Sequence, residues 1–293
     1  MLTDGSYLLS HVGFSREEEP VLIVQQNDTL QTINTFDFIG TLSFDLSARH
    51  CTGWHDITTG DNFICPDHEI IDAKYEQCSA CQKRTGFNPA FYNATTVSEQ
   101  QQQRNIEPHA LYLAYFGSDV IKVGITHAKR GYRRLLEQGA RSTLMLDTFP
   151  TALIARQYES QIARLSGIAE TIQLRKKIEL LPIEWNNTLA EQTLLETKRR
   201  IENDIKVQFN GEKIVHFYDR YFKTPPSSLV HVHNCTTEAR ISGVTIGTVG
   251  SLLLTAQDDN VFVLPLKKFT GYNMLVSQNQ TLIDVPARQT SLF

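Results

Sequence analysis

The stretch HALYLAYFGSDVIKVGIT, residues 109–126, decides the fold of the middle of this chain. Ala110–Phe116 is an unbroken apolar and aromatic run, which is typical of a buried strand, and Val120–Ile125 is a second such run. Gly117–Asp119 between them favours a tight turn, because Gly and Asp tolerate the backbone angles that turns need. The stretch therefore predicts a β-hairpin.

The residues after this hairpin continue the pattern of a compact module. Arg130–Gln138 predicts a short helix that stops at Gly139, and Leu144–Phe149 predicts a third strand. Thr151–Leu165 carries apolar residues at a spacing of three and four, as a long helix does. The expected order is β-β-α-β-α, and residues 186–206 predict a further helix.

The segments on both sides of this module are predicted to be rich in strands. Leu42, Phe44 and Leu46 alternate with polar residues near the N-terminus, and the chain returns to strand patterns from Ile214 onward. Similar triplets, Phe-Ile-Gly at 38–40 and Ile-Ser-Gly at 241–243, begin strands in the two segments. This weak similarity suggests that the two β segments pack together.

Composition bounds the class of protein. The chain has 293 residues, of which 41% are hydrophobic and 20% charged, as in folded proteins with about two domains. The net charge of −4 excludes a globally basic nucleic-acid coat, so any polyanion site has to come from local clustering. No apolar run reaches the ~20 residues that cross a bilayer, and the first residues lack the regions of a signal peptide. We expect a cytoplasmic protein with no membrane partner, in which disulfides are disfavoured.

Four of the five cysteines lie in a stretch with little apolar material for a core. A C-x2-C pair brings two thiolates onto one ion, and two further sulfurs close a tetrahedral Zn²⁺ site whose binding energy would fold the segment. The predicted ligands of this structural zinc are Cys51, Cys65, Cys78 and Cys81.

Other interpretations of these cysteines remain open. The first two do not form a C-x2-C pair, so His50, His55 or His68 is a substitute ligand for one of them. The first two cysteines can also be ordinary buried thiols, and a redox C-x2-C is a further possibility. Cys235 stands apart and is expected to be a bystander.

The sequence thus predicts an α+β protein in which a β-β-α-β-α module is flanked by a zinc-binding segment and small β regions. The expected parts are an N-terminal β segment (1–50), the zinc-binding cysteine cluster (51–96), a linker (97–107), the module with its helical extension (108–206), a C-terminal β domain (207–278) and a flexible tail (279–293).

The module carries a local excess of positive charge. Between residues 122 and 141 there are six cations and one anion, Glu137, inside an acidic chain. Such clusters neutralise phosphates, although a solvated helix face gives the same pattern. The residues that we predict to bind nucleic acid are Lys122, Lys129, Arg130, Arg133 and Arg141, with Arg134 beside them.

Taken together, these motifs resemble those of the GIY-YIG nuclease superfamily over about residues 108–170. The Tyr of HALY (109–112) stands for the first motif, and KVG (122–124) stands for the second in its Lys-type variant. RLLEQ (134–138) stands for the helix with an Arg, and ARQYE (155–159) stands for the helix with an acidic ligand. Most of the chain also looks like an uncharacterised bacterial family in which a cysteine cluster precedes this module.

The resemblance implies an endonuclease-like phosphodiesterase with a single divalent cation, Mg²⁺ or Mn²⁺. Glu159 would hold that cation, Arg134 (or its neighbour Arg133) would clamp the scissile phosphate, and Tyr112 would activate or position water. Lys122 takes the place of the second-motif Tyr and Gln138 that of the helix His. A protonated lysine binds phosphate but is a poor base, so a non-catalytic nucleic-acid-binding adaptor is the alternative. A third interpretation is a zinc-containing protein that neither cuts nor binds nucleic acid.

The chain ends in Gln-Thr-Ser-Leu-Phe, residues 289–293. This resembles the Gln-x-x-Leu-Phe motif by which bacterial DNA polymerases and repair proteins bind the sliding clamp, with Gln289 as polar anchor and Leu292 and Phe293 in an apolar pocket. The two apolar residues can instead pack on the protein's own surface. The overall expectation is a protein of DNA repair or replication, with DNA favoured over RNA as the partner.

Overall fold

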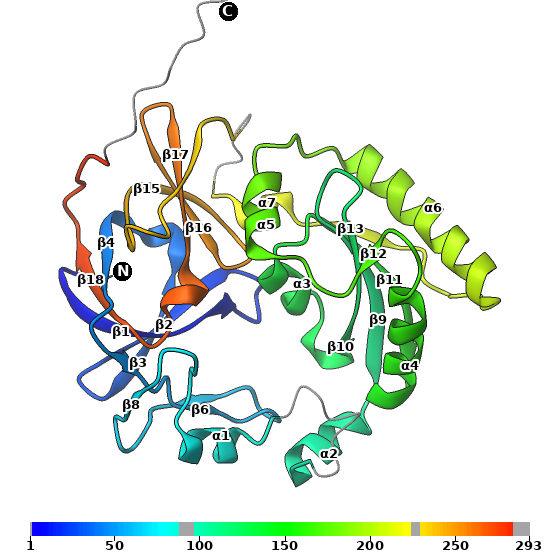
Figure 1. Ribbon diagram of the computed structural model, residues 1–293, viewed down its shortest axis with the longest axis horizontal. Coiled ribbons are helices and arrows are strands. Elements are labelled where there is room, and N and C mark those ends of the chain that lie inside the picture. The colour runs from blue at the N-terminus through cyan, green and yellow to red at the C-terminus, as the bar shows by residue number, and fades with distance from the viewer. Residues whose placement is uncertain (1, 88–96, 224–228, 284–293) are drawn as a thin grey trace, which may run out of the picture.

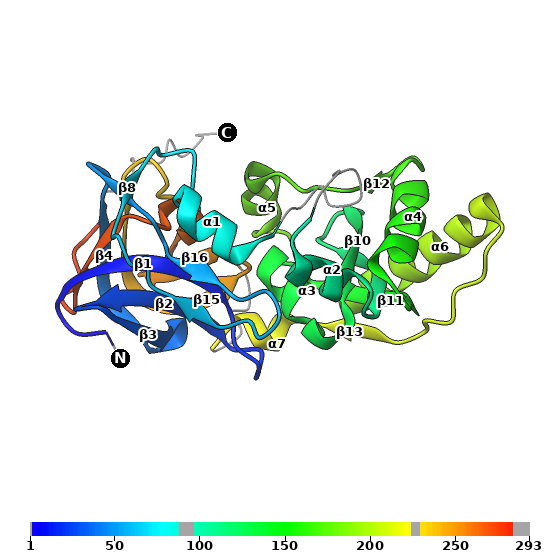
Figure 2. The ribbon, with the colours of Figure 1, turned by 90° about the horizontal axis from the view of Figure 1, so that it is seen from below.

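The computed structural model describes residues 2–87, 97–223 and 229–283, and it is built on two large sheets (Figure 1). Figure 2 shows the strands of the N- and C-terminal segments on one side and the module with its helices on the other. The fold is a mixed α/β one. No helix of the described residues is long and apolar enough to cross a membrane.

The larger sheet joins the two ends of the chain. Its nine strands run in the order β14-β17-β16-β15-β4-β18-β1-β2-β3, so that β4 lies between two strands of the C-terminal segment. Gly40 pairs with Gly243 in the contact between β4 and β15, which confirms that the two β segments pack together. The strands are β1 (Gly5–Phe14), β2 (Pro20–Gln26), β3 (Thr29–Asn34), β4 (Ile39–Asp45), β14 (Val232–Asn234), β15 (Arg240–Val249), β16 (Leu252–Gln257), β17 (Asn260–Pro265) and β18 (Asn273–Ser277), with 3-10 turns η1 (Thr35–Asp37) and η3 (Leu266–Phe269).

The segments 1–50 and 207–278, which we listed as separate β regions, therefore largely form one sheet. The physical reason is that a short isolated sheet leaves unpaired edges, and each segment supplies partners for the edges of the other. A common apolar core lies on this sheet and takes residues from both, among them Leu9, Leu42 and Met274. Cys235 belongs to the same core, away from the other cysteines.

The smaller sheet has the order β12-β10-β9-β11-β13. The predicted β-β-α-β-α order is confirmed in β9, β10, α3, β11 and α4. The elements are β9 (His109–Tyr115), β10 (Ile121–His127), η2 (Ala128–Arg130), α3 (Arg133–Gln138), β11 (Ser142–Phe149), α4 (Ala152–Ala163), β12 (Ile168–Ala169), α5 (Leu174–Leu180), α6 (Asn187–Ile205), β13 (Ile214–His216) and α7 (Tyr218–Tyr221).

Strand β9 is central in this sheet and buried on both faces, as its unbroken apolar run predicts. Leu111 and Leu113 pack in the core that α4 and α6 cover. Tyr112 and Ala114 point to the other face, into a core that also contains Leu135 of α3. That second core includes residues of β1, β15 and β16 as well, so the two sheets pack against each other through shared apolar side chains.

Residues 97–107, which we predicted as a linker, contain helix α2 (Glu99–Asn105). The Ser98 side chain accepts a hydrogen bond from the Gln101 backbone N–H, which caps the helix, and glutamine is an adequate helix former. The guanidinium of Arg104 donates to the carbonyl of Ile57, which ties α2 to the cysteine segment. The connection is therefore structured, and its polar composition reflects an exposed helix face.

Candidate functional site

The four cysteines of the predicted zinc site lie together. The sulfurs of Cys51, Cys65, Cys78 and Cys81 are all within 4.8 Å of one another, and all four residues are buried. The Cys65 and Cys78 sulfurs are 4.0 Å apart. Four sulfurs at ~2.3 Å from one tetrahedral ion stand about 3.8 Å from each other, so the cluster has the size of a metal site. None of the three alternative histidines belongs to the cluster.

Short local elements place these sulfurs. The cysteine segment contains β5 (Arg49–His50), β6 (Trp54–His55), β7 (Asn62–Phe63), β8 (Ile70–Ile71) and α1 (Ser79–Thr85). Cys78 is the N-cap of α1 and accepts a hydrogen bond from the Cys81 N–H, so the C-x2-C pair closes the first turn of this helix. Gly53 has φ +84°, and a Cβ there would stand 1.9 Å from the Phe63 carbonyl oxygen, so only glycine lets β6 approach the strand that precedes Cys65.

The surroundings of each sulfur shift the pKa of its thiol. Burial raises the pKa of Cys51 to about 11, and burial also raises the pKa of Cys81. Burial acts in the same direction on Cys65, but hydrogen bonds from the backbone of Glu69 and Asp67 and from the Cys51 and Cys81 side chains together lower the pKa of that thiol. A bound cation would turn all four into thiolates, since thiols lose their protons on coordination. The cluster could hold one metal ion with four sulfur ligands.

The residues that resemble nuclease motifs also come together, although they lie on four different elements. Tyr112 is on β9, Lys122 on β10, Arg134 on α3 and Glu159 on α4. The charges of Arg134 and Glu159 act on both Tyr112 and Lys122, so the four side chains share one electrostatic environment. We call these four residues the module site.

Tyr112 and Gly124 face each other in the centre of the module site. They are paired across β9 and β10, and a Cβ on Gly124 would stand 2.4 Å from the Tyr112 hydroxyl oxygen. The glycine of the second motif therefore makes room for the tyrosine ring. Gln138 donates a hydrogen bond of 2.8 Å from its amide to the Tyr112 hydroxyl. Burial raises the pKa of Tyr112, so at neutral pH the phenol keeps its proton.

Glu159 and Lys122 already have partners within the protein. Glu159 is buried in α4 and forms an ion pair with Arg156, three residues earlier on the same helix. Burial raises the pKa of Glu159, which Arg156 opposes. The Lys122 ammonium donates to the backbone carbonyl of Glu170, and burial lowers its pKa.

The predicted nucleic-acid ligands differ in how available they are. Arg134 is 44% exposed. Its guanidinium is 4.0 Å from the carboxylate of Glu137, which is a loose ion pair. Arg130 is closely paired with the same Glu137, and exposed Lys129 is paired with Glu107. Arg133 is half-buried at the start of α3.

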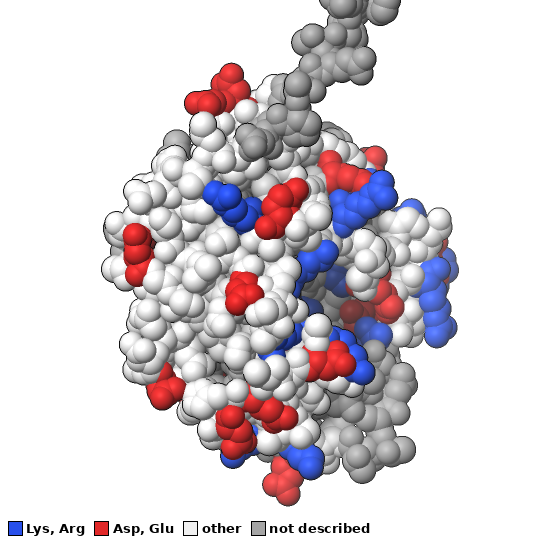
Figure 3. Space-filling model, turned by 60° about the vertical axis from the view of Figure 1, so that its left-hand side comes forward, with Lys and Arg blue, Asp and Glu red and all other residues white. Residues whose placement is uncertain are grey.

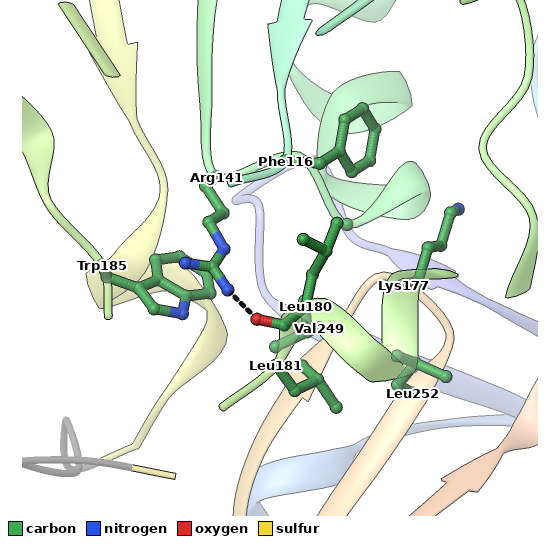
Figure 4. Close-up of a pocket in the computed structure, with 9 residues that line it drawn as sticks. Phe116, Arg141, Lys177, Leu180, Leu181, Trp185, Val249 and Leu252 are labelled. Carbon is green, nitrogen blue, oxygen red and sulfur yellow. Dashed lines mark hydrogen bonds between the residues drawn. The ribbon is translucent and has the colours of Figure 1, made fainter. Parts of the chain in front are cut away.

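Arg141 was predicted to bind nucleic acid and lies instead in the interior. Its guanidinium donates to the carbonyls of Leu180, Ile183 and Glu184, and it stacks at 4.5 Å on the ring of Trp185 (Figure 4). Burial lowers its pKa to about 10, so it remains charged at neutral pH. Arg141 is buried, and its hydrogen bonds to three backbone carbonyls hold the guanidinium inside the fold, so the structure does not support it as a phosphate ligand.

Sequence reasoning missed several charged residues of this region. Arg156 and Glu170 reach the module site from α4 and the loop after β12. Lys177 of α5 donates to the carbonyl of Gln138 at 2.6 Å. The i, i+3 spacing of Arg156 and Glu159 was a signal in the sequence for their pairing. Nothing in the local pattern connects residue 177 with residue 122. Gln289, Leu292 and Phe293 lie outside the described residues.

Comparisons with known proteins give a family. The family model described as "Protein of unknown function (DUF2797)" matches residues 73–274. No curated protein and no solved structure matches the chain.

Proposed function

The chain belongs to the DUF2797 family, whose function is unknown, and we propose that it is a metal-dependent phosphodiesterase that acts on nucleic acid. DNA is the favoured substrate. The observation that carries the proposal is the convergence of Tyr112, Lys122, Arg134 and Glu159 on one place, from two strands, β9 and β10, and two helices, α3 and α4.

Each residue of the module site has a role that its surroundings support. Arg134 is exposed and loosely paired, so its planar guanidinium is available to hold a phosphate with two hydrogen bonds. Tyr112 is buried, and its hydroxyl accepts a hydrogen bond from Gln138 and keeps its own proton; it would position a water molecule that enters beside it with the substrate. Lys122 would add positive charge beside the same phosphate, close to Arg134 and Glu159.

Glu159 is the residue that would hold Mg²⁺ or Mn²⁺. Magnesium sites often use one or two carboxylates, with phosphate oxygens and waters as the other ligands, so one protein carboxylate suffices once a substrate is bound. Such an ion offsets the charge that builds on the phosphate and favours deprotonation of a bound water. Arg156 would have to turn from Glu159 toward the substrate, where it can contact a phosphate as well.

The four-cysteine cluster would hold Zn²⁺ as a structural ion. Four sulfur ligands would fill all positions of a tetrahedral site, which would leave none open for a substrate. We assign it the role of folding the cysteine segment next to α2 and the module.

We expect the wild-type protein to cut labelled DNA in Mg²⁺ or Mn²⁺, and Glu159→Gln to lower the cleavage rate about 100-fold or more. The reason is that the amide keeps the shape of the side chain but cannot bind the ion with a negative charge. Branched, single-stranded and duplex DNA and RNA substrates, assayed by gel, measure the rate. Glu170→Gln is the matched control, because this carboxylate also contacts Arg156 but is 48% exposed. Equal cutting by the wild type and Glu159→Gln would contradict the proposal.

A second candidate, a non-catalytic nucleic-acid-binding adaptor, is favoured by the ion pair between Arg156 and Glu159. That pair neutralises the only carboxylate proposed as a metal ligand. In this case the protein would shift labelled DNA in a gel without cutting it, and Glu159→Gln would leave the affinity unchanged. Arg133→Ala with Arg134→Ala would weaken binding and lower its salt dependence.

The Gln-x-x-Leu-Phe sequence supports a further proposal, that the tail tethers the protein to a bacterial sliding clamp. We expect Leu292→Ala with Phe293→Ala to weaken clamp binding by at least tenfold, because the two apolar side chains would fill the central pocket. Surface plasmon resonance on immobilised clamp measures this. Ser291→Ala, a position that the motif leaves variable, serves as the control, and similar affinities for all variants would rule the motif out.

A further inference from the structure

A face of the molecule is hollowed, and Lys and Arg side chains gather around the hollow with a few acidic ones among them (Figure 3). Charged and titratable side chains from three parts of the chain act on one another between the two sheets. The module contributes Lys122, Arg130, Arg134 and Lys177, the cysteine segment contributes His55, and the nine-stranded sheet contributes His11 of β1 and Lys267 of η3.

The two sheets meet at His11. This side chain is exposed, yet Glu137 and Arg130 of the module act on it from one side and Lys267 and His55 from the others. A Cβ on Gly13, two residues along β1, would lie 2.9 Å from the His11 ring and 3.8 Å from the Glu137 carboxylate. The side chain is therefore accessible to water and at the same time surrounded by protein, as a group on the wall of a cleft is.

Lys177 links the module site to the opposite wall. Burial first, and repulsion from Arg134, Lys122 and Lys267 in addition, lower its pKa to about 8. Lys267 is exposed on η3 of the nine-stranded sheet. Lys177 is therefore repelled by two cations of the module and by one cation of the facing sheet.

The lysines of this cleft have few carboxylates near them. Among the described residues, no carboxylate lies within ion-pair distance of Lys122, Lys177 or Lys267. Glu137 is taken by Arg130 and Glu159 by Arg156. Like charges held near one another raise the free energy of the unbound protein, and an anion that enters relieves the repulsion.

We propose that the phosphate backbone of the nucleic acid runs through this cleft and is contacted by Lys267 on the nine-stranded sheet as well as by Lys177 and the module site. This inference rests on the proposed function and extends the binding surface to a part of the chain outside the module. A lone inorganic phosphate would need only one wall, whereas a strand with successive phosphates matches cations on both walls. The nine-stranded sheet then supplies one wall of the nucleic-acid interface, through Lys267.

The test uses the full chain and a fluorescein-labelled single-stranded DNA, with binding followed by anisotropy over a series of salt concentrations. Lys267→Glu should weaken binding about tenfold or more and lower the slope of log K against log salt by roughly one, since each lost phosphate contact on a single strand removes ~0.7. Lys268→Glu is the matched control. It is the next residue on η3, it is also exposed, and it is not among the charges that act on His11 or Lys177.

The outcomes separate this inference from the proposed function. If Arg134→Ala weakens binding and Lys267→Glu behaves like Lys268→Glu, the module binds nucleic acid but the cleft does not extend to the facing sheet, and the inference is overturned. If the wild type does not bind DNA or RNA at moderate salt, the proposed function falls together with it. Melting temperatures of the two exposed-lysine variants should equal that of the wild type.

Discussion

Cys81→Ser is expected to release the bound metal and unfold the cysteine segment. Cys81 is completely buried, and the only described core of this segment consists of the four cysteines with Trp54, Ile71 and Ala80 packed against them. Structural zinc contributes about 10–16 kcal/mol in small zinc-binding peptides, far more than such a small apolar cluster supplies. Losing one of four ligands therefore removes most of what holds the segment together.

Metal content and limited proteolysis measure this effect. The wild type should carry one zinc per chain by elemental analysis, and Co²⁺ in its place should give the charge-transfer bands of thiolate ligands. Cys81→Ser should lose the metal, and proteases should then cut between residues 51 and 87. Cys235→Ala is the control, because this thiol is buried in the core of the nine-stranded sheet and should leave one zinc bound. A wild-type protein that folds without any metal would contradict the assignment.

Arg141→Ala is expected to lower the free energy of unfolding by about 3 kcal/mol or more, which corresponds to a melting temperature roughly 6–12 °C lower. The substitution leaves the carbonyls of Leu180, Ile183 and Glu184 without their donor in the interior. It also removes the guanidinium that stacks on Trp185 between the two sheets. The cost comes from these unpaired buried groups as well as from lost packing.

Thermal unfolding followed by circular dichroism tests this, with Arg134→Ala as the control. Arg134 is exposed and loosely paired, so its loss should change the melting temperature little while it weakens nucleic-acid binding. Arg141→Lys should recover only part of the stability, because one ammonium cannot reach three carbonyls. A melting temperature of Arg141→Ala equal to the wild-type value would show that the internal hydrogen bonds of this arginine contribute nothing.

The contrast between Arg134 and Arg141 shows that a run of basic residues in the sequence does not reveal which of them are exposed. Both lie in the same run of cations, and the sequence treats them alike. The structure exposes the first and buries the second on backbone carbonyls more than 35 residues further along the chain. Burial of an individual charge depends on segments that pack over it, which a local count of charges does not contain.

The linker shows the same limit in another form. Residues 97–107 contain only two apolar residues, Val97 and Ile106, and so carry no periodicity from which a helix can be recognised. Helix α2 forms because Ser98 caps it and because Arg104 reaches the Ile57 carbonyl. The first of these is visible in the sequence, but the second needs the tertiary fold.

The amino-acid pattern alone predicts the order of elements in the module and identifies the four clustered cysteines. Both rest on local information: the period of apolar residues reports which face of an element is buried, and sulfur ligands have few other uses in a segment without a core. Tertiary structure alone decided that Gly40 pairs with Gly243, that Arg141 is internal, and that Lys177 and Lys267 face a common cleft. These contacts join residues that are 39 to about 200 positions apart, and no local pattern of side chains specifies which distant segment a strand or a charge will meet.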